Sequence, residues 1–295
     1  MDFTKTIHSN IMPINDEVTQ AASVDLYLLR EDEIHPEISG NKFRKLKYNV
    51  LFAKKEKVKG ICTYGGPHSN HILATAVACK LNGLRSKAYI RKGYSELMMT
   101  PTIEQSIQNG MEINWLGHED FRQQKLKTGV DEGWLYIPEG GANTMGVDGC
   151  KEIMEAIPKD TDKIAVACGT GSTLSGMIIG SCVSQQLIGV SVLKAPGMIR
   201  QEIRRWATKQ NYEVFEDYHF GGYARANQEL FTFIQWFYQQ HKVILDLVYT
   251  GKLMIALYDL MKNGKLTNCS MVAVHTGGIQ GNNGMEKRYG MSLFD

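Results

Sequence analysis

The spacing of apolar residues along this chain alternates between short continuous runs and the period of a helix. The run Ile61–Tyr64 is typical of a buried strand, and Ala88–Ile90 is a second such run. Between them, Asn70–Leu81 has the period of a helix that ends before Gly83. Further strands are predicted at Glu112–Leu116, Leu135–Ile137, Ile164–Ala167, Ile188–Leu193 and Met271–His275. Strands that alternate with helices predict an α/β fold with mostly parallel sheets flanked by helices.

The length of the chain, 295 residues, suggests two domains at about 150 residues each. No internal repeat or low-complexity linker marks the boundary, so the division follows from the length and from the positions of the loops. We expect a larger domain formed by residues 1–50 and 145–295, and a smaller α/β domain formed by residues 51–144. A cleft between two such domains would suit a ligand.

Charge and cysteine content exclude several classes of partner. The 33 basic and 31 acidic side chains nearly balance, which argues against nucleic acid or an anionic membrane surface and favours a small molecule. No apolar run reaches the length of a membrane span, and the polar segment Met1–Asn10 lacks a signal-peptide core, so we expect a cytoplasmic protein. The six cysteines form no C-x-x-C pair, so we expect neither a metal site nor disulfides.

Two lysines stand near the start of an amphipathic helix, in the motif Ser39–Lys45. Apolar residues recur at helical spacing from Phe43, and Lys42 and Lys45 therefore lie on roughly one face. One amine could bond an aldehyde carbon while the other neutralises a phosphate, and pyridoxal phosphate carries both groups. A solvated basic helix end explains the same pattern, so other segments must decide.

The loop Cys168–Gly176 follows a predicted strand and opens a helix. Its glycines and hydroxyls, together with the helix N-terminus, are suited to a phosphate group. The loop completes neither the P-loop nor the dinucleotide fingerprint. A tight strand-to-helix turn is an equally good interpretation of this loop taken alone.

A second loop, Gly65–His71, also joins a strand to a helix. Ser69 or Asn70 stands at the capping position, where backbone amides and side chains could bind a carboxylate. Asn70 alone could be an ordinary N-cap. No residue four positions after His71 would complete a metal site.

Two more strand ends carry glycine pairs, Pro138–Asn143 and His275–Gly278. Strand ends of this kind line the ligand crevice of open α/β sheets. Four such ends in one chain favour a single cleft over unrelated turns.

These motifs, in this order, resemble the family of D-cysteine desulfhydrases and 1-aminocyclopropane-1-carboxylate deaminases, which are pyridoxal-phosphate enzymes of fold type II related to the tryptophan synthase β-subunit. The resemblance spans most of the chain and rests on the segments 30–32, 39–46, 65–66, 69–71, 138–141, 169–171, 248–252 and 275–278. It implies two open twisted, mostly parallel sheets flanked by helices, with the active site in the interdomain cleft. One departure is His68, where family members commonly have glutamine.

The resemblance also implies pyridoxal 5'-phosphate as the cofactor and a homodimer as the assembly. Its catalytic residues would be Lys42, Tyr249 and Ser69. The cofactor would be bound by Lys42, Lys45, Asn70, Cys168, Gly169, Thr170, Gly171, Ser172, Thr173, Thr250 and Thr276. Lys45 and the loop 168–173 would hold its phosphate, and Asn70 its ring hydroxyl. The substrate, a small amino acid, would contact Ser69, Asn70, His71, Tyr223 and Tyr249.

Two positions distinguish the family's activities: they are glutamate and leucine in the deaminases and small hydroxyl residues in the desulfhydrases. Here they are Thr250 and Thr276. A hydroxyl near the pyridine nitrogen would not hold it protonated as a carboxylate would, which suits β-elimination. The sequence therefore favours a lyase that converts D-cysteine to pyruvate, ammonia and hydrogen sulfide.

Several alternatives stay open. The same cofactor could serve the cyclopropane amino acid, D-serine, a β-substituted alanine or an L-amino acid. A non-catalytic α/β protein that binds a phosphate ligand is an alternative of another class, as is a cofactor-binding protein with little activity.

Overall fold

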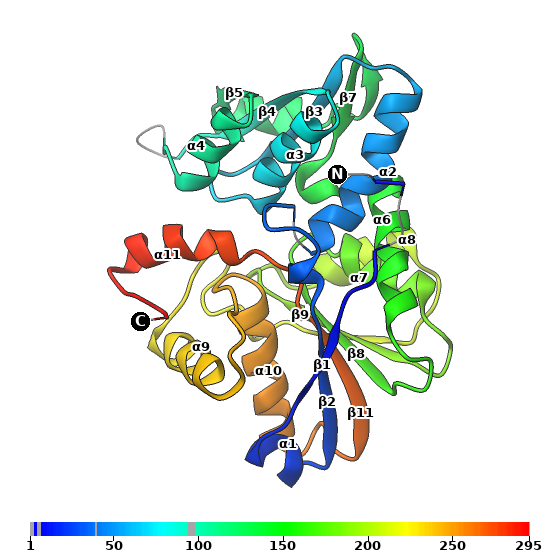
Figure 1. The fold of residues 1–295 in the computed structure, drawn as a ribbon, viewed down its shortest axis with the longest axis vertical. Helices are drawn as coiled ribbons and strands as arrows, with labels where there is room; N and C mark the ends of the chain where they lie inside the picture. The colour runs from blue at the N-terminus through cyan, green and yellow to red at the C-terminus, as the bar shows by residue number, and fades with distance from the viewer. Residues whose placement is uncertain (1–2, 5–6, 39, 94–97, 295) are drawn as a thin grey trace.

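The computed structural model describes residues 3–4, 7–38, 40–93 and 98–294, and its strands form two separate sheets. Ser39, the first residue of the lysine motif, lies outside the described residues. Figure 1 shows the smaller sheet above the larger one, with the helix α2 (Asn41–Lys55) between them. The α/β class with helix-flanked, mostly parallel sheets is confirmed.

The larger sheet has six strands in the order β1-β2-β11-β8-β9-β10. All neighbours are parallel except β1 and β2. Parallel order requires crossover connections, and these are helices that cover both faces. The strands are β1 (Ile11–Ile14), β2 (Val24–Leu29), β8 (Lys163–Cys168), β9 (Gln186–Ser191), β10 (Tyr212–Phe215) and β11 (Cys269–Val274).

Alternating residues of these strands face two different apolar layers. Ala165 and Ile188 pack with α9 (Gln228–His241) and α10 (Thr250–Lys262). Ile164, one residue earlier in the chain, packs on the other face with α7 and α8. The remaining helices around this sheet are α1 (Glu17–Ala21), α6 (Thr144–Lys151), α7 (Ser172–Gly180), α8 (Met198–Trp206) and α11 (Asn282–Tyr289).

The smaller sheet has five strands in the order β5-β4-β3-β7-β6, of which only β6 is antiparallel to its neighbour. The helices α3 and α4 pack on one face, and Phe121 of α5 packs on the other. The elements are β3 (Gly60–Gly65), α3 (Asn70–Leu81), β4 (Arg85–Arg91), α4 (Pro101–Gln108), β5 (Met111–Leu116), α5 (His118–Gln124), β6 (Gly129–Asp131) and β7 (Trp134–Ile137).

Helix α2 joins the two halves. Its residues Phe43, Leu46 and Val50 belong to the apolar core beneath the smaller sheet. Its other side packs tightly on α6, where a Cβ atom on Gly149 would lie 1.9 Å from the Arg44 carbonyl oxygen. The expected domain boundary after residue 50 therefore falls inside one continuous helix. We retain the two-domain division as a proposal, with α2 as the element that both halves share.

No helix in the described ranges is long and apolar enough to cross a membrane.

Candidate active site

A cavity of about 340 Å³ lies between the two halves of the molecule and is lined by residues of both. Most of the predicted site residues line it: Lys42, Lys45, Ser69, Asn70, His71, Cys168, Gly169, Thr170, Gly171, Thr173, Tyr223 and Tyr249. Thr276 lines a small adjoining space together with Lys42, Asn70 and Tyr249. Ser172 and Thr250 are buried behind the wall. The structure thus brings together residues that are up to about two hundred positions apart in the chain, because parallel strands end at the same edge of each sheet.

The side chain of Lys42 reaches into this cavity from the first turn of α2. Its Nζ donates a hydrogen bond to Asn41 Oδ1 at 3.0 Å and lies 5.9 Å from the centroid of the Tyr249 ring. Burial, and next the charge of Lys45, lower the pKa of Lys42 to about 7. A substantial fraction of this amine is therefore neutral near pH 7 and able to act as a nucleophile or a base.

Lys45 lies one turn further along α2 and faces the loop after β8. Its Nζ donates to Ser172 Oγ at 2.8 Å and to the Gly140 carbonyl oxygen at 3.0 Å. Ser172 Oγ also lies 2.9 Å from Thr170 Oγ1. No carboxylate of the described residues forms an ion pair with Lys45, which is 2 % exposed. A buried cation among hydroxyls at a helix N-terminus is suited to an anion such as a phosphate.

The loop 168–173, which leads into α7 and which we call the phosphate cup, has a backbone conformation suited to binding an anion. Gly171, which precedes α7, has φ of 83°, a left-handed conformation that glycine adopts without strain. Asn41 Nδ2 donates to Thr173 Oγ1 at 2.9 Å and so joins α2 to the cup. Lys42, Lys45 and the cup are therefore held as one unit.

The start of α3 presents a different set of groups. Ser69 is the N-cap, but its side chain makes no capping hydrogen bond, and Asn70 Oδ1 is buried without a partner in the part of the chain that the structure describes. Unsatisfied groups at a helix N-terminus are suited to a ligand that brings its own donors and acceptors.

The hydrogen bonds of His71 determine the state of its ring. Thr63 Oγ1 donates its only proton to the Ile137 carbonyl oxygen at 3.0 Å, so it accepts from His71 Nε2, also at 3.0 Å. Nδ1 is then the unprotonated nitrogen, and it is buried without a partner. Burial, with the charges of Lys42 and Lys45, keeps the pKa of His71 well below its usual value. The ring is neutral, so a substrate carboxylate at this helix would be bound by N–H and O–H groups and not by an imidazolium.

Tyr249 and Tyr223 stand together on the side of the larger domain. Their rings meet edge to face, with centroids 6.1 Å apart. Desolvation, with a smaller contribution from Tyr223, raises the pKa of Tyr249 well above its usual value. The phenol of Tyr249 therefore keeps its proton at neutral pH and can donate it.

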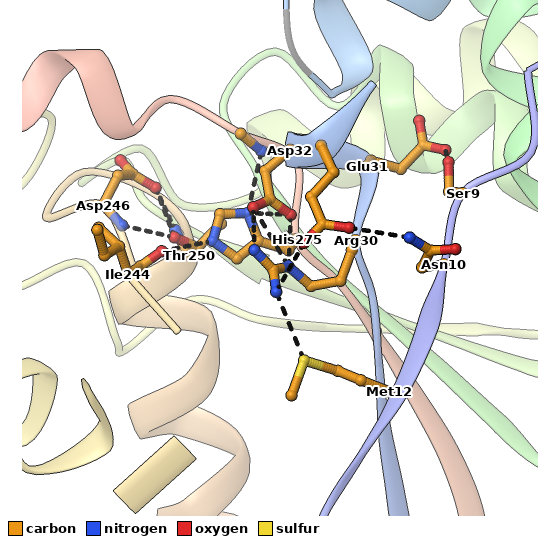
Figure 2. A network of polar contacts seen from close by, with 12 residues as sticks. Ser9, Asn10, Met12, Arg30, Glu31, Asp32, Ile244, Asp246, Thr250 and His275 are labelled. Carbon is orange, nitrogen blue, oxygen red and sulfur yellow. Dashed lines mark hydrogen bonds and ion pairs between the residues drawn. The ribbon is translucent and has the colours of Figure 1, made fainter. Parts of the chain in front are cut away.

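Asp246 fixes the turn that carries Tyr249 and Thr250. Its carboxylate accepts hydrogen bonds from the N–H groups of Val248, Tyr249 and Thr250 at 2.7 to 2.9 Å. The Thr250 hydroxyl donates to Asp246 Oδ1 at 2.7 Å and accepts from the Asp246 N–H at 2.8 Å, as Figure 2 shows. The hydroxyl of Thr250 thus donates one hydrogen bond to Asp246 and accepts another from it in the absence of any ligand.

A second cluster of polar contacts in Figure 2 surrounds His275, the residue before Thr276. Its Nε2 donates to the Ile244 carbonyl oxygen at 2.8 Å, and its Nδ1 lies 3.4 Å from Asp32 Oδ1. Arg30 in turn forms a 2.7 Å ion pair with Asp32. This buried network fixes the end of β11 beside the strand β2.

Sequence reasoning missed several residues of the cavity wall. They are Asn41, Arg91, Glu139, Leu193 and Met198. Arg91 directly follows a predicted strand and Leu193 is the last residue of another, and a strand end is the signal that could have identified them. Glu139 lies in the segment Pro138–Asn143, which was expected to line the crevice, but no role was assigned to it. Met198 carries no such signal, because an apolar residue after a strand has many uses.

Comparisons with known proteins agree with this geometry. A sequence profile described as pyridoxal-phosphate dependent enzyme matches residues 15–277. A provisionally named 1-aminocyclopropane-1-carboxylate deaminase of Pyrococcus furiosus is 31 % identical over 293 residues, covering 90 % of this chain and 88 % of that protein. A D-cysteine desulfhydrase of Salmonella schwarzengrund is 26 % identical, covering 86 % of this chain and 87 % of that protein.

Among solved structures, that of a homologue of 1-aminocyclopropane-1-carboxylate deaminase superposes with a TM-score of 0.80. It is 27 % identical and covers 94 % of this chain and 91 % of the other.

Proposed function

Because this chain belongs to the family of pyridoxal-phosphate dependent enzymes and within it to the lyases that include the deaminases and desulfhydrases above, we propose that its reaction is β-elimination from D-cysteine. The products would be pyruvate, ammonia and hydrogen sulfide. The observation that carries the proposal is the pairing of a lysine whose pKa is lowered to about 7 with a tyrosine that keeps its proton, in one cavity. This is a base and an acid of the kind that an elimination needs.

The residues of the cavity fit the cofactor. Lys42 would hold its aldehyde carbon, and Lys45 with the loop 168–173 would bind its phosphate, since these groups form a buried cationic cup. Asn70, whose Oδ1 has no partner among the described residues, would contact the ring hydroxyl, and Thr250 and Thr276 would lie toward the ring nitrogen. When bound, the cofactor supplies an electron sink that stabilises negative charge at the substrate α-carbon.

The chain's own residues account for the proton movements. The substrate carboxylate would lie at the start of α3, against Ser69 and the N–H groups of Asn70 and His71. The amine of Lys42, once the amino group of the substrate has displaced it, would take the proton from the α-carbon. The Cβ–S bond then breaks with its electron pair on sulfur, which receives a proton from the phenol of Tyr249. Water hydrolyses the remaining unsaturated amino acid to pyruvate and ammonia.

The two threonines support this choice of reaction. Neither position 250 nor position 276 carries a carboxylate, and the proton of the Thr250 hydroxyl is already donated to Asp246. Opening a cyclopropane ring offers no α-proton for Lys42 to remove and needs more electrophilic assistance than a threonine provides.

The test is a set of assays on purified enzyme with D-cysteine, L-cysteine, D-serine and 1-aminocyclopropane-1-carboxylate. We expect sulfide and pyruvate in equal amounts from D-cysteine, and neither product from the Lys42→Ala variant. Turnover of the cyclopropane substrate without release of sulfide from D-cysteine would replace the proposal with deamination. That alternative is favoured by the similarity to the Pyrococcus protein. A protein that never acquires visible absorbance would instead be a binding protein.

Homodimeric assembly and a cytoplasmic location stay predictions. Sedimentation equilibrium would test the first, with an expected mass of twice 33.1 kDa.

A further inference from the structure

One charged residue of the cavity wall has no part in the mechanism above. Arg91 is the last residue of β4, and its side chain lines the cavity from the side of the smaller sheet. Within the described residues its guanidinium has no hydrogen bond or ion pair, and its one recorded contact is the ring of Phe121 at 5.7 Å. An arginine that is free of partners beside a ligand cavity is available to bind an anion from the ligand.

The anion that Arg91 could bind is distinct from those already assigned. In the proposed function, the cofactor phosphate is bound by Lys45 and the phosphate cup, and the α-carboxylate of the substrate is bound at the start of α3. Arg91 and Tyr223 line the same cavity, Arg91 from the smaller sheet and Tyr223 from the larger domain. The positive charge of Arg91 opposes the rise that desolvation causes in the pKa of Tyr223. A substrate whose carboxylate lies at α3 would extend its side chain toward this region.

Glu139 is the opposing charge to consider. It lines the same cavity from the loop after β7 and is not within ion-pair distance of Arg91. Arg91 ends β4 and Glu139 follows β7, so the two charged side chains come to the cavity wall from different strands.

We propose that Arg91 is a specificity residue that binds an anionic group on the substrate side chain. The site then prefers small amino acids whose side chain ends in an anion, such as a thiolate or a carboxylate, over uncharged ones of the same shape. This inference rests on the proposed function, because it assumes that an amino acid occupies the cavity. An arginine at this position favours D-cysteine, whose thiol can ionise, and gives no advantage to a substrate with a cyclopropane ring.

The experiment compares D-aspartate with D-asparagine, which have the same shape and differ in side-chain charge. Each is titrated into the holoenzyme, and binding is followed by the visible absorbance of the cofactor rather than by turnover. We expect D-aspartate to bind about fivefold more tightly, as one solvent-accessible ion pair provides. Arg91→Gln should bring the two affinities together, and Arg91→Lys should retain part of the difference.

Two further variants make the result specific. Lys92→Gln removes a neighbouring exposed charge outside the cavity wall and should leave the preference unchanged. Glu139→Gln should increase the preference for D-aspartate. If Glu139→Gln instead lowers the preference as Arg91→Gln does, the preference does not come from the positive charge of Arg91 and the proposal is wrong.

These binding experiments can fail without the proposed reaction being wrong, and the proposed reaction can fail without them. An enzyme that releases sulfide from D-cysteine but binds D-aspartate and D-asparagine equally would overturn the role of Arg91 alone. An enzyme that prefers D-aspartate through Arg91 but releases no sulfide would overturn the proposed reaction alone.

Discussion

At the scale of single residues, the site depends on which side chains hold protons. The cavity wall lowers the pKa of Lys42 to about 7 and raises that of Tyr249 well above its usual value. The same low polarity therefore makes the lysine a base and keeps the tyrosine an acid.

We predict that the apoenzyme binds pyridoxal phosphate covalently at a rate that rises with pH and levels off above about 7 to 8. Only the neutral amine of Lys42 attacks an aldehyde, and its pKa is about 7. Stopped-flow absorbance across pH 5.5 to 9.5 would measure this rate at an approximately constant cofactor concentration. A midpoint near the ordinary lysine value of about 10.4 would contradict the lowered pKa.

We predict that Tyr249→Phe lowers the turnover of D-cysteine by about 100-fold or more, the usual contribution of a general acid. The ring stays, so the packing against Tyr223 is retained. The variant should process β-chloro-D-alanine nearly normally, because chloride leaves without a proton. Equal losses on both substrates, measured as pyruvate release, would show that Tyr249 does not donate the proton.

Much of the site was accessible from the sequence, but not the wall around it. Lys42, Lys45 and the loop 168–173 were predicted because glycines, hydroxyls and lysines next to strand ends carry a recognisable chemistry. The neutral state of His71 could not be predicted, since it depends on Thr63 and on the Ile137 carbonyl oxygen of another strand. Arg91 belongs to the site only because β4 ends at the cavity.

At the scale of elements, the helix α2 is held by buried charges. Arg44 forms two hydrogen bonds with Glu31, at 2.7 and 3.0 Å, and lies 3.4 Å from Glu152. Glu31 is completely buried and Arg44 is 1 % exposed. Arg44 lies between Lys42 and Lys45 in the sequence, so this network helps to fix the helix that presents both lysines.

We predict that Arg44→Met destabilises the protein by about 3 to 5 kcal/mol, because Glu31 would keep a buried charge without its cation. Urea unfolding of the apoprotein would measure the change. The matched control is Arg122→Met, since Arg122 and Glu119 form an exposed ion pair at 3.9 Å. That variant should change the free energy of unfolding by less than about 1 kcal/mol. Equal effects in the two variants would contradict the assigned role of the network.

The elements themselves were predicted where the pattern was strong. The helix Asn70–Leu81 and the central strands of both sheets are confirmed, because buried parallel strands form apolar runs. The apolar residues Leu230, Phe231, Ile234 and Phe237 of α9 pack in the core of the larger domain. The segment Gly117–Glu132 was assigned no strand, yet it contains β6, whose three residues are exposed. Only pairing with β7 makes this segment a strand, and pairing is not visible in a local pattern.

At the scale of the whole molecule, the cavity exists because two sheets present their strand ends to each other. The larger sheet contributes the phosphate cup and the two tyrosines, and the smaller sheet contributes the start of α3 and Arg91. Helix α2 packs on both halves and presents the lysines between them.

We predict that the apoprotein becomes more stable as pH rises from about 7 to about 8.5, by about 2 kcal/mol in all. Above that pH the buried cysteines, whose pKa values burial raises, act in the opposite direction. Lys42 has a folded pKa of about 7 and Lys252 one of about 8, whereas the unfolded chain keeps these protons to about 10.4. Between these values the unfolded state binds more protons, so deprotonation favours folding. Urea unfolding at several pH values would measure this, and a Lys252→Met variant should flatten the rise. Stability that falls across this range would contradict the shifts.

The distribution of hydrogen bonds around the cavity also determines which parts of it could be redesigned. At the cofactor end, Asn41 is hydrogen-bonded to Thr173 and Lys45 to Ser172, and a Cβ atom on Gly40 would lie 1.9 Å from the Thr276 carbonyl oxygen. Arg91, Leu193 and Met198 line the cavity from separate segments and take no part in these hydrogen bonds. A laboratory library at these three positions could therefore broaden the range of accepted amino acids while the chemistry of Lys42 stays intact.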